Sequence, residues 1–270
     1  MPACGYAHYP EASPRLSCRP GEYYHYSNAA YSILGLTLDR FLKKDVDPAL
    51  SIESWIEEHI FDAVGMADTV YTWADYSSSQ KLRSAHGCYG GKDYTSCNFA
   101  RALTDYADRG IKTPPGGIWS TSDDLARYLL SFNELPGAGK ITEQEQSVPY
   151  DAVSEEDKIH MPAGIFSYSK GWYMSQDFSC TDGQQSTFMQ GAWGTVPGFT
   201  SYMMTNPQPT ADQDQYAIVA LRSYNHAGRL NLGNQVRRFL WRLLHPQMPV
   251  SELRCPVVVP DAHATGDSPI

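Results

Sequence analysis

A short polar segment, Tyr26-Ser27-Asn28, follows a Pro20-Gly21 turn and brings together side chains that can do chemistry. A tyrosine hydroxyl can pass a proton to or from a reacting group, and an asparagine amide can orient a carbonyl. Apolar residues recur at helical spacing just after this segment, at positions 30, 33, 34, 38 and 41. With Ser27 and Asn28 as candidate caps, the spacing predicts an amphipathic helix over 29–42 with the polar triplet at its N-terminus.

The segment resembles the second motif of the serine β-lactamase, penicillin-binding protein and esterase superfamily, which is Tyr-x-Asn after a Pro-Gly turn. The resemblance implies that Tyr26 is a general base or a proton shuttle to the leaving group, and that Asn28 orients a catalytic lysine and the substrate carbonyl. Two plainer interpretations stay open. Tyr26 can be one of 18 tyrosines packed at a helix start, and Asn28 can be a helix cap, a role compatible with the first.

The superfamily acylates a serine in a Ser-x-x-Lys motif that precedes Tyr-x-Asn, and this chain has no such motif before Tyr26. Its first 25 residues contain no lysine. Two Ser-x-x-Lys strings occur later, at 78–81 and 167–170. Catalysis needs the serine at the start of a helix with the lysine one turn on, whereas we expect the first string in a serine-rich loop and the second leading into a strand. Both are therefore expected to be chance matches, with the nucleophile missing from an N-terminally truncated or mis-started chain.

A third family motif, Lys/His-Ser/Thr-Gly, lies on a strand that lines the site and precedes a Gly-Phe pair. Counting back from Gly198-Phe199 places Ala192-Trp193-Gly194 there, so the usual cation is absent. Trp193-Gly194-Thr195 resembles the Trp-Gly-Gly of esterase branches, with Thr195 in place of the second glycine. Because a substrate carboxylate would lack its cationic partner, the resemblance implies a neutral ester or amide rather than penicillins or peptidoglycan. Trp193 can equally be a core aromatic.

Two further segments resemble the superfamily and point to its fold. Residues 61–69 are similar to Phe-x-Pro-Leu-Gly-Met-x-x-Thr, with Ala63 and Val64 where proline and leucine are usual. Residues 116–126 are close to Gly-Gly-x-x-Ser-Thr-x-x-Asp-Leu-Ala. In this second segment Thr121 and Asp124 have the spacing of a capping box, which predicts a helix up to residue 130.

The rest of the pattern predicts helices first and strands afterwards. A capping serine and apolar spacing predict a second amphipathic helix over 51–61, and 71–112 are expected to be loops that form a variable wall of the site. Short β-rich runs then alternate with turns, as is typical of an antiparallel meander, and 231–244 form a closing helix with one apolar face. The four runs are 171–174, 186–190, 200–204 and 215–221.

The resemblance implies an α+β fold of the β-lactamase/transpeptidase type, in which a helical subdomain lies beside an antiparallel sheet flanked by helices. Because the family's Ser-x-x-Lys part is not found, we expect the core to be open on one side. The expected organisation is an irregular lead-in at 1–19, a single domain at 20–245 and a loose tail at 246–270, the domain comprising a helical part at 20–132, a flexible insertion at 133–164, and the sheet with the C-terminal helix at 165–245.

The amino-acid composition limits the classes of partner that this chain can bind. With 21 basic and 30 acidic residues, the net charge of −9 disfavours nucleic acid and anionic membranes and favours a small neutral or cationic substrate. No stretch is apolar enough to span a bilayer and no export signal is present, so we expect a soluble protein of unknown compartment. The histidines form no zinc-like ligand set, and neither a metal nor a cofactor is expected. The six cysteines are expected mainly as unpaired thiols, with Cys88 and Cys97 the best-placed pair under oxidation.

Two functions from different classes are compatible with these observations. The first is a serine hydrolase or acyltransferase of the esterase branch, acting on a small ester or amide through an acyl-serine whose nucleophile is missing from this chain. The second is a degenerate, non-catalytic protein that keeps the pocket and binds a ligand or a partner. An in-frame Ser-x-x-Lys in the DNA upstream of Met1 would decide for the enzyme. The oligomeric state is open.

Overall fold

The computed structural model describes residues 27–87, 113–133, 148–149, 165–176, 188–196, 198–207 and 215–223, together with residues 236 and 239. These residues form a six-stranded antiparallel sheet and a group of helices that precede it in the chain. The predicted α+β class is therefore confirmed. The six cysteines, the lead-in at 1–19 and the tail at 246–270 lie outside the described residues.

The sheet is a meander in which each strand pairs with the next one along the chain, in the order β1-β2-β3-β4-β5-β6. This confirms the predicted meander, because the four predicted runs lie at β3 to β6. β2 is an additional strand, although its alternation Ile-Phe-Ser-Tyr-Ser is itself typical of a strand. The strands are β1 (Val148–Pro149), β2 (Ile165–Ser169), β3 (Trp172–Gln176), β4 (Phe188–Val196), β5 (Phe199–Thr205) and β6 (Ala217–Arg222).

A two-residue turn joins β2 to β3. Lys170 has φ +48° and Gly171 has φ +91°, and a positive φ at both central residues is what a type I′ hairpin turn requires. The 167–170 Ser-x-x-Lys string therefore runs from a strand into a hairpin turn. Its serine and lysine do not have helical spacing, in agreement with the prediction that this string is a chance match.

The helices expected from capping signals are present. Their caps are Ser27, Ser51 and Thr121, whose hydroxyl oxygens accept from the backbone N–H three residues on. The predicted helix over 51–61 begins as an α-helix and continues as a π-helical segment (Glu57–Asp62). The α-helices are α1 (Asn28–Phe41), α2 (Ile52–Ile56), α3 (Ser78–Arg83) and α5 (Ser122–Leu130).

The expectation of loops over 71–112 is wrong for part of this range. A 3₁₀ turn forms at Trp73–Asp75 and the helix α3 follows. The reason is a capping box that the serine-rich composition obscured: Ser77 Oγ accepts from the Gln80 N–H at 3.3 Å, and Gln80 Oε1 accepts from the Ser77 N–H at 2.9 Å. Residues 88–112 lie outside the described residues.

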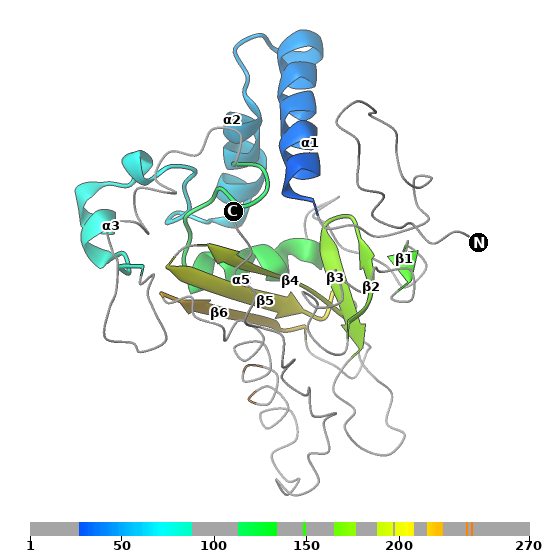
Figure 1. Ribbon diagram of the computed structural model, residues 1–270. Helices are drawn as coiled ribbons and strands as arrows, with labels where there is room; N and C mark the ends of the chain where they lie inside the picture. Colours follow the sequence, from blue (N-terminus) through cyan, green and yellow to red (C-terminus); the bar gives the residue numbers. More distant parts are fainter. Residues whose placement is uncertain are drawn as a thin grey trace, which may run out of the picture.

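Two core clusters lie on opposite faces of the sheet. On one face Leu129 of α5 and the following Phe132 pack against Trp172 and Met174 of β3. On the other face Met189, Tyr202 and Met204 pack together. Alternate residues of a strand point to opposite faces, so the sheet is buried on both sides. In Figure 1, α5 lies against β5 and β6, and α1 and α2 lie side by side above the sheet in this view.

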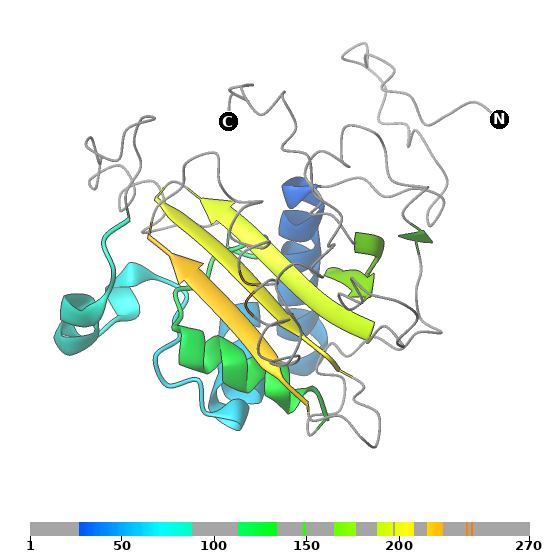
Figure 2. The ribbon, with the colours of Figure 1, turned by 90° about the horizontal axis from the view of Figure 1, so that it is seen from below.

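A third cluster joins α5 to the segment that follows α2. Phe61, Met66, Tyr71 and Leu125 are its buried members. The segment 61–69 thus packs against α5 through Leu125, as two neighbouring parts of one fold. Figure 2 shows the resulting arrangement from below, with α3 at one side of the molecule and the β2–β3 hairpin at the other.

The apolar side chains of α1 face solvent along much of the helix. Ile33 is 65% exposed, Phe41 53% and Leu34 49%, whereas the buried position within the helix is Gly35. Gly35 lies so close to Pro114 that an added Cβ would overlap the proline ring. The predicted helix is therefore present, but it packs through its glycine side. Its exposed apolar face agrees with the expectation that one side of the core is open.

Candidate functional site

Ser27 and Asn28 form the N-terminus of α1, which we call the α1 mouth. Ser27 has extended backbone, and its Oγ accepts from the Ala30 N–H at 3.1 Å, so Ser27 is the cap. Of the two candidate caps, Asn28 is instead the first helical residue, with an exposed side chain. This removes the helix-cap interpretation of Asn28. Tyr26, the predicted proton shuttle, lies outside the described residues.

Tyr31, one turn further along α1, attaches this mouth to the sheet. Its hydroxyl lies 2.5 Å from the hydroxyl of Tyr168 on β2, and a Cβ added to Gly171 would lie 2.9 Å from the Tyr31 hydroxyl oxygen. The hairpin turn therefore presents backbone without a side chain to Tyr31. Sequence analysis did not single out Tyr31, and its only signal was its place one turn after Asn28.

A row of aromatic rings continues from Tyr168 to β4. Tyr168 meets Tyr173 edge to face at 4.9 Å between ring centroids, and Tyr173 stacks on Trp193 at 3.6 Å. Contacts thus connect the α1 mouth with Trp193, two parts of the predicted site that are far apart in the sequence. Trp193 is half-buried and also packs against the cluster of Met189, Tyr202 and Met204, on the sheet face away from α5. Trp193 therefore contributes to the core.

The β4 strand has one open edge at the predicted substrate-binding residues. β3 pairs with β4 only over Phe188–Gly191, while β5 pairs with it over Gln190–Val196. Within the described part of the chain, the outer edge of residues 192–195 has no strand partner. Thr195 is exposed, and a Cβ at Gly194 would lie 3.1 Å from Ser201 Oγ. Backbone N–H and C=O groups at such an edge can hydrogen-bond an extended or carbonyl-bearing ligand.

The position of the family cation is apolar here. Ala192 packs against the cluster under α5, at the point where Lys or His was sought from the sequence. The described residues contain no group of three or more side chains suited to hold a metal ion. No helix in the described segments is long and apolar enough to cross a lipid bilayer.

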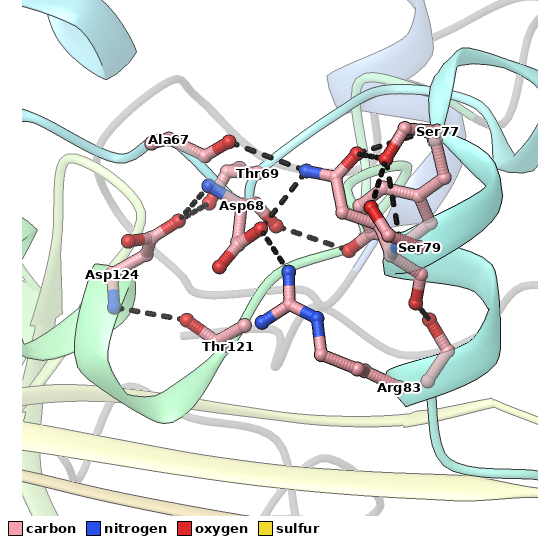
Figure 3. Close-up of polar contacts among 11 residues, drawn as sticks. Ala67, Asp68, Thr69, Ser77, Ser79, Arg83, Thr121 and Asp124 are labelled. Atoms are coloured by element: carbon pink, nitrogen blue, oxygen red, sulfur yellow. Dashed lines mark hydrogen bonds and ion pairs between the residues drawn. The ribbon is translucent and has the colours of Figure 1, made fainter.

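A polar network holds the two remaining family-like segments together (Figure 3). The Asp124 carboxylate accepts from the Asp68 N–H and from Thr69 Oγ1, both at 2.8 Å, and Thr69 Oγ1 also lies 2.7 Å from Ser120 Oγ. Asp124 is only 5% exposed. The predicted capping box is therefore half correct. Thr121 Oγ1 accepts from the Asp124 N–H at 3.2 Å, but the carboxylate of Asp124 binds the neighbouring segment instead of the cap.

Asp68 supplies the outer part of this network. Its carboxylate accepts from Gln80 Nε2 at 2.9 Å and from Arg83 Nη2 at 3.1 Å. The Gln80 amide, together with the Arg83 guanidinium, holds the pKa of Asp68 below its usual value. Tyr76 donates to the Asp68 carbonyl, and burial with the nearby Asp68 and Asp124 charges raises the pKa of Tyr76 to about 12. We assign this network to structure, since most of its polar contacts join α3 or α5 to residues 67–76.

The 78–81 string requires a correction, because it lies on a helix and not in a loop. Ser78 is the first residue of α3 and Lys81 lies one turn on. The string therefore has the helical spacing of a Ser-x-x-Lys motif, which we did not expect from the sequence. However, Lys81 Nζ donates to the Ala74 carbonyl at 3.2 Å, and no hydrogen bond of the exposed Ser78 side chain is found among the described residues. Figures 1 and 2 both place α3 away from the β2–β3 hairpin that contacts α1.

Comparison with known proteins matches this architecture. A sequence model of the family described as Beta-lactamase matches residues 10–238. The chain is 23% identical over 192 residues to Beta-lactamase-like protein 4 of Dictyostelium discoideum, covering 69% of this chain and 31% of that protein. It is 22% identical over 210 residues to Protein flp of Staphylococcus aureus (strain MW2), covering 78% of this chain and 35% of that protein. The chain spans about a third of the length of these curated relatives. With the family match covering most of its length, this chain belongs to the beta-lactamase family, a serine hydrolase-like superfamily.

Proposed function

We propose that this protein binds a small neutral ester or amide at the mouth of α1, in a site of the esterase or acyltransferase type that lacks its serine nucleophile in this chain. The observation that carries the proposal is the row of contacts from Tyr31 through Tyr168 and Tyr173 to Trp193. This row links the start of α1, which bears Asn28, to β4 through side chains of β2 and β3. β4 has an open edge there, and Ala192, on the face of β4 opposite Trp193, supplies no cation.

The preference for a neutral ligand follows from charge. A carboxylate is bound well only where a cation or several N–H donors replace its water, and Ala192 offers no charge where the family carries Lys or His. The net charge of −9 repels anions further. Asn28 and the open edge at Gly194 and Thr195 offer neutral hydrogen-bonding groups, which suit an ester or amide carbonyl.

The groups needed for acyl transfer are not assembled in the described part of this site. Ser27 is the serine inside the motif, and its hydroxyl caps α1. Tyr26 would move a proton between a nucleophile and the leaving group, but it cannot replace the nucleophile itself. On this basis we also propose, as the second candidate, a non-catalytic ligand- or partner-binding protein. The α3 position of the one helical Ser-x-x-Lys string in the described residues favours it.

A matched pair of esters tests the proposal. Dimethyl succinate is neutral, while monomethyl succinate differs by one carboxylate, and their dissociation constants can be measured by ligand-observed NMR at pH 7. We expect the neutral ester to bind about tenfold or more tightly than the anionic one, a difference of about 1.4 kcal/mol. Equal or tighter binding of the anion would contradict the proposal.

Two lysine variants test whether the preference for the neutral ester arises at this site. Thr195→Lys, at the open edge and on the same face of β4 as Trp193, should shift the preference towards monomethyl succinate. Leu82→Lys adds the same charge on α3, at an 88% exposed position away from this site, and should leave the preference nearly unchanged. Circular dichroism of both variants checks that the fold is retained. Equal shifts in the two variants would mean that overall charge, and not the position of Thr195, sets the preference.

A further inference from the structure

Tyr31 attaches the first turn of α1 to the sheet through its hydroxyl group. The hydroxyl oxygen lies 2.5 Å from the hydroxyl oxygen of Tyr168 on β2, a residue 137 positions further along the chain. Both side chains are half-buried, so water competes less for this hydrogen bond than it does at an exposed pair. The bond therefore fixes the distance between the start of α1 and β2.

The turn between β2 and β3 leaves room for the same hydroxyl. Gly171 in this turn has φ +91°, and a Cβ added there would lie 2.9 Å from the Tyr31 hydroxyl oxygen. A side chain at this position would both strain the turn and displace the tyrosine. Tyr31 thus meets two groups of the hairpin, one hydroxyl and one stretch of backbone.

Two other hydrogen bonds at the start of α1 lie within the helix. Ser27 Oγ accepts from the Ala30 N–H at 3.1 Å, and Ser32 Oγ donates to the Asn28 carbonyl at 3.1 Å. Because both partners of each bond belong to the same helix, these bonds shape the first turn but do not set where it lies relative to the sheet. The bond from α1 to β2 sets that position.

Asn28 lies close to Tyr31 on α1. It is the first helical residue, and residues three apart on a helix share a face, with Cβ atoms about 5–6 Å apart. Helix ends fray readily, since the first N–H groups lack partners within the helix. A contact at Tyr31 that limits fraying therefore also restricts Asn28.

We propose that Tyr31 is a positioning residue for the ligand site at the α1 mouth. By bonding to Tyr168 it holds the first turn of α1 at the place where the Asn28 amide meets the carbonyl of the ligand. This role rests on the proposed function, because the neutral ester or amide and the part played by Asn28 belong to that proposal. Tyr31 acts through Asn28, while its own hydroxyl bonds to the protein.

Removing either hydroxyl of the pair should weaken ligand binding by the same factor. Tyr31→Phe and Tyr168→Phe each delete one oxygen and keep the ring, and both break the same hydrogen bond. We expect each variant to bind dimethyl succinate about fivefold more weakly than the wild type, which is the effect of about one hydrogen bond. A response to Tyr31→Phe alone would mean that the ligand bonds directly to Tyr31, and would contradict a positioning role.

A double-mutant cycle with Asn28 gives the measurement that a purely structural role would not change. The dissociation constant of dimethyl succinate is measured for Asn28→Ala with and without Tyr31→Phe. In the Asn28→Ala background we expect Tyr31→Phe to change this constant by less than about twofold, because no amide is left to position. A general loosening of the site would weaken binding by a similar factor in both backgrounds.

Tyr76→Phe is the matched control. Tyr76 is a buried tyrosine whose hydroxyl donates to the Asp68 carbonyl at 3.1 Å, in the polar network around Asp68. Losing this bond should lower the free energy of unfolding, as Tyr31→Phe does, but should leave the dissociation constant of dimethyl succinate unchanged. Circular dichroism of every variant checks that the fold is retained.

Three results would overturn the positioning role. If the wild type binds neither succinate ester, the proposed function falls and the role of Tyr31 falls with it. If the wild type binds dimethyl succinate and a folded Tyr31→Phe variant binds it equally well, the positioning role alone is wrong. It is also wrong if Tyr31→Phe weakens binding as much in the Asn28→Ala background as in the wild type, or if Tyr76→Phe weakens binding to the same extent.

Discussion

Asp124 joins α5 to residues 68 and 69 through two hydrogen bonds. It is buried, and its carboxylate accepts from Thr69 Oγ1, 55 residues away in the chain, and from the Asp68 N–H. Replacing this carboxylate by a neutral group weakens two charge-assisted hydrogen bonds at once, those from the Asp68 N–H and from Thr69 Oγ1. Such a loss costs more than an exposed hydrogen bond because water cannot replace the acceptor.

We predict that Asp124→Asn lowers the free energy of unfolding by about 2 kcal/mol. The matched control is Asp123→Asn, one residue earlier in the same helix turn and exposed, which should change it by less than about 0.5 kcal/mol. Urea unfolding at pH 7 gives both values. Similar effects of the two substitutions would show that the network does not hold these segments together.

Asp68 gives the stability a pH dependence. Its pKa is lowered in the folded protein, first by the Gln80 hydrogen bond and then by Arg83. A carboxyl with a lowered pKa stabilises the fold above its unfolded pKa, near 3.9, and this contribution is lost as pH falls through the folded value. We predict that, between about pH 6 and pH 3, the wild type loses more unfolding free energy than Asp68→Asn. Parallel urea midpoints over that range would contradict this.

For single residues, the sequence predicted which side chains take part in the structure better than it predicted their hydrogen-bond partners. The capping Thr121 was identified, but the carboxylate of Asp124 was assigned to the cap, because a spacing of three residues cannot reveal a competing partner 55 residues away. Of the two candidate caps at the α1 mouth, only Ser27 is used. Tyr31 was not identified, since a tyrosine at a helical position gives no local sign of its partner on β2.

Among the elements, the β2–β3 turn is the one that the α1 mouth depends on. Gly171 has φ +91°, where a side chain is strained, and it also borders the Tyr31 hydroxyl. We predict that Gly171→Ala lowers the free energy of unfolding by about 1–2 kcal/mol and loosens the first turn of α1. Gly116→Ala is the control, because nothing lies within 4 Å of its added Cβ.

Hydrogen exchange and urea unfolding together check this prediction. Faster exchange of the α1 N-terminal turn in Gly171→Ala, and not in Gly116→Ala, would support the contact between hairpin and helix. If Gly171→Ala unfolds at a lower urea concentration but leaves exchange in α1 unchanged, the turn is strained without holding the helix mouth.

Element types were largely predictable, because caps and apolar periods are local signals. The helices over 29–42 and 51–61, and the four strand runs, are present. The helix α3 was missed because a run of serines was taken as a loop, although Ser77 and Gln80 have the spacing of a capping box. The predicted closing helix is described only at Val236 and Phe239, which are helical.

For the molecule as a whole, the exposed face of α1 is the main unusual feature. Apolar periodicity shows which side of a helix is apolar, but not which side packs, and here Gly35 and not the leucines contacts the neighbouring turn. We predict that Ile33→Gln combined with Leu34→Gln changes the unfolding free energy by no more than about 1 kcal/mol, whereas Leu129→Ala costs about 2–5 kcal/mol.

The same face should bind a hydrophobic dye. We expect the wild type to bind anilinonaphthalene sulfonate in its folded state and the double glutamine variant to bind less. A circular dichroism melt complements this, because an exposed apolar face favours a low or broad transition. A sharp transition above physiological temperature, without dye binding, would contradict the open core.

Our central proposal is that this chain keeps the scaffold of an acyl-transfer site without an active serine, and covalent labelling tests it most directly. The purified chain is treated with a fluorophosphonate probe, and separately with a chromogenic short-chain ester, and is analysed by intact mass and by rapid kinetics. We predict no stoichiometric adduct and no burst, because Ser27 caps a helix and Lys81, one turn after Ser78, donates to the Ala74 carbonyl. Stoichiometric labelling that Ser78→Ala or Ser167→Ala abolishes would show that one of the two Ser-x-x-Lys strings is a working nucleophile, and would contradict the account.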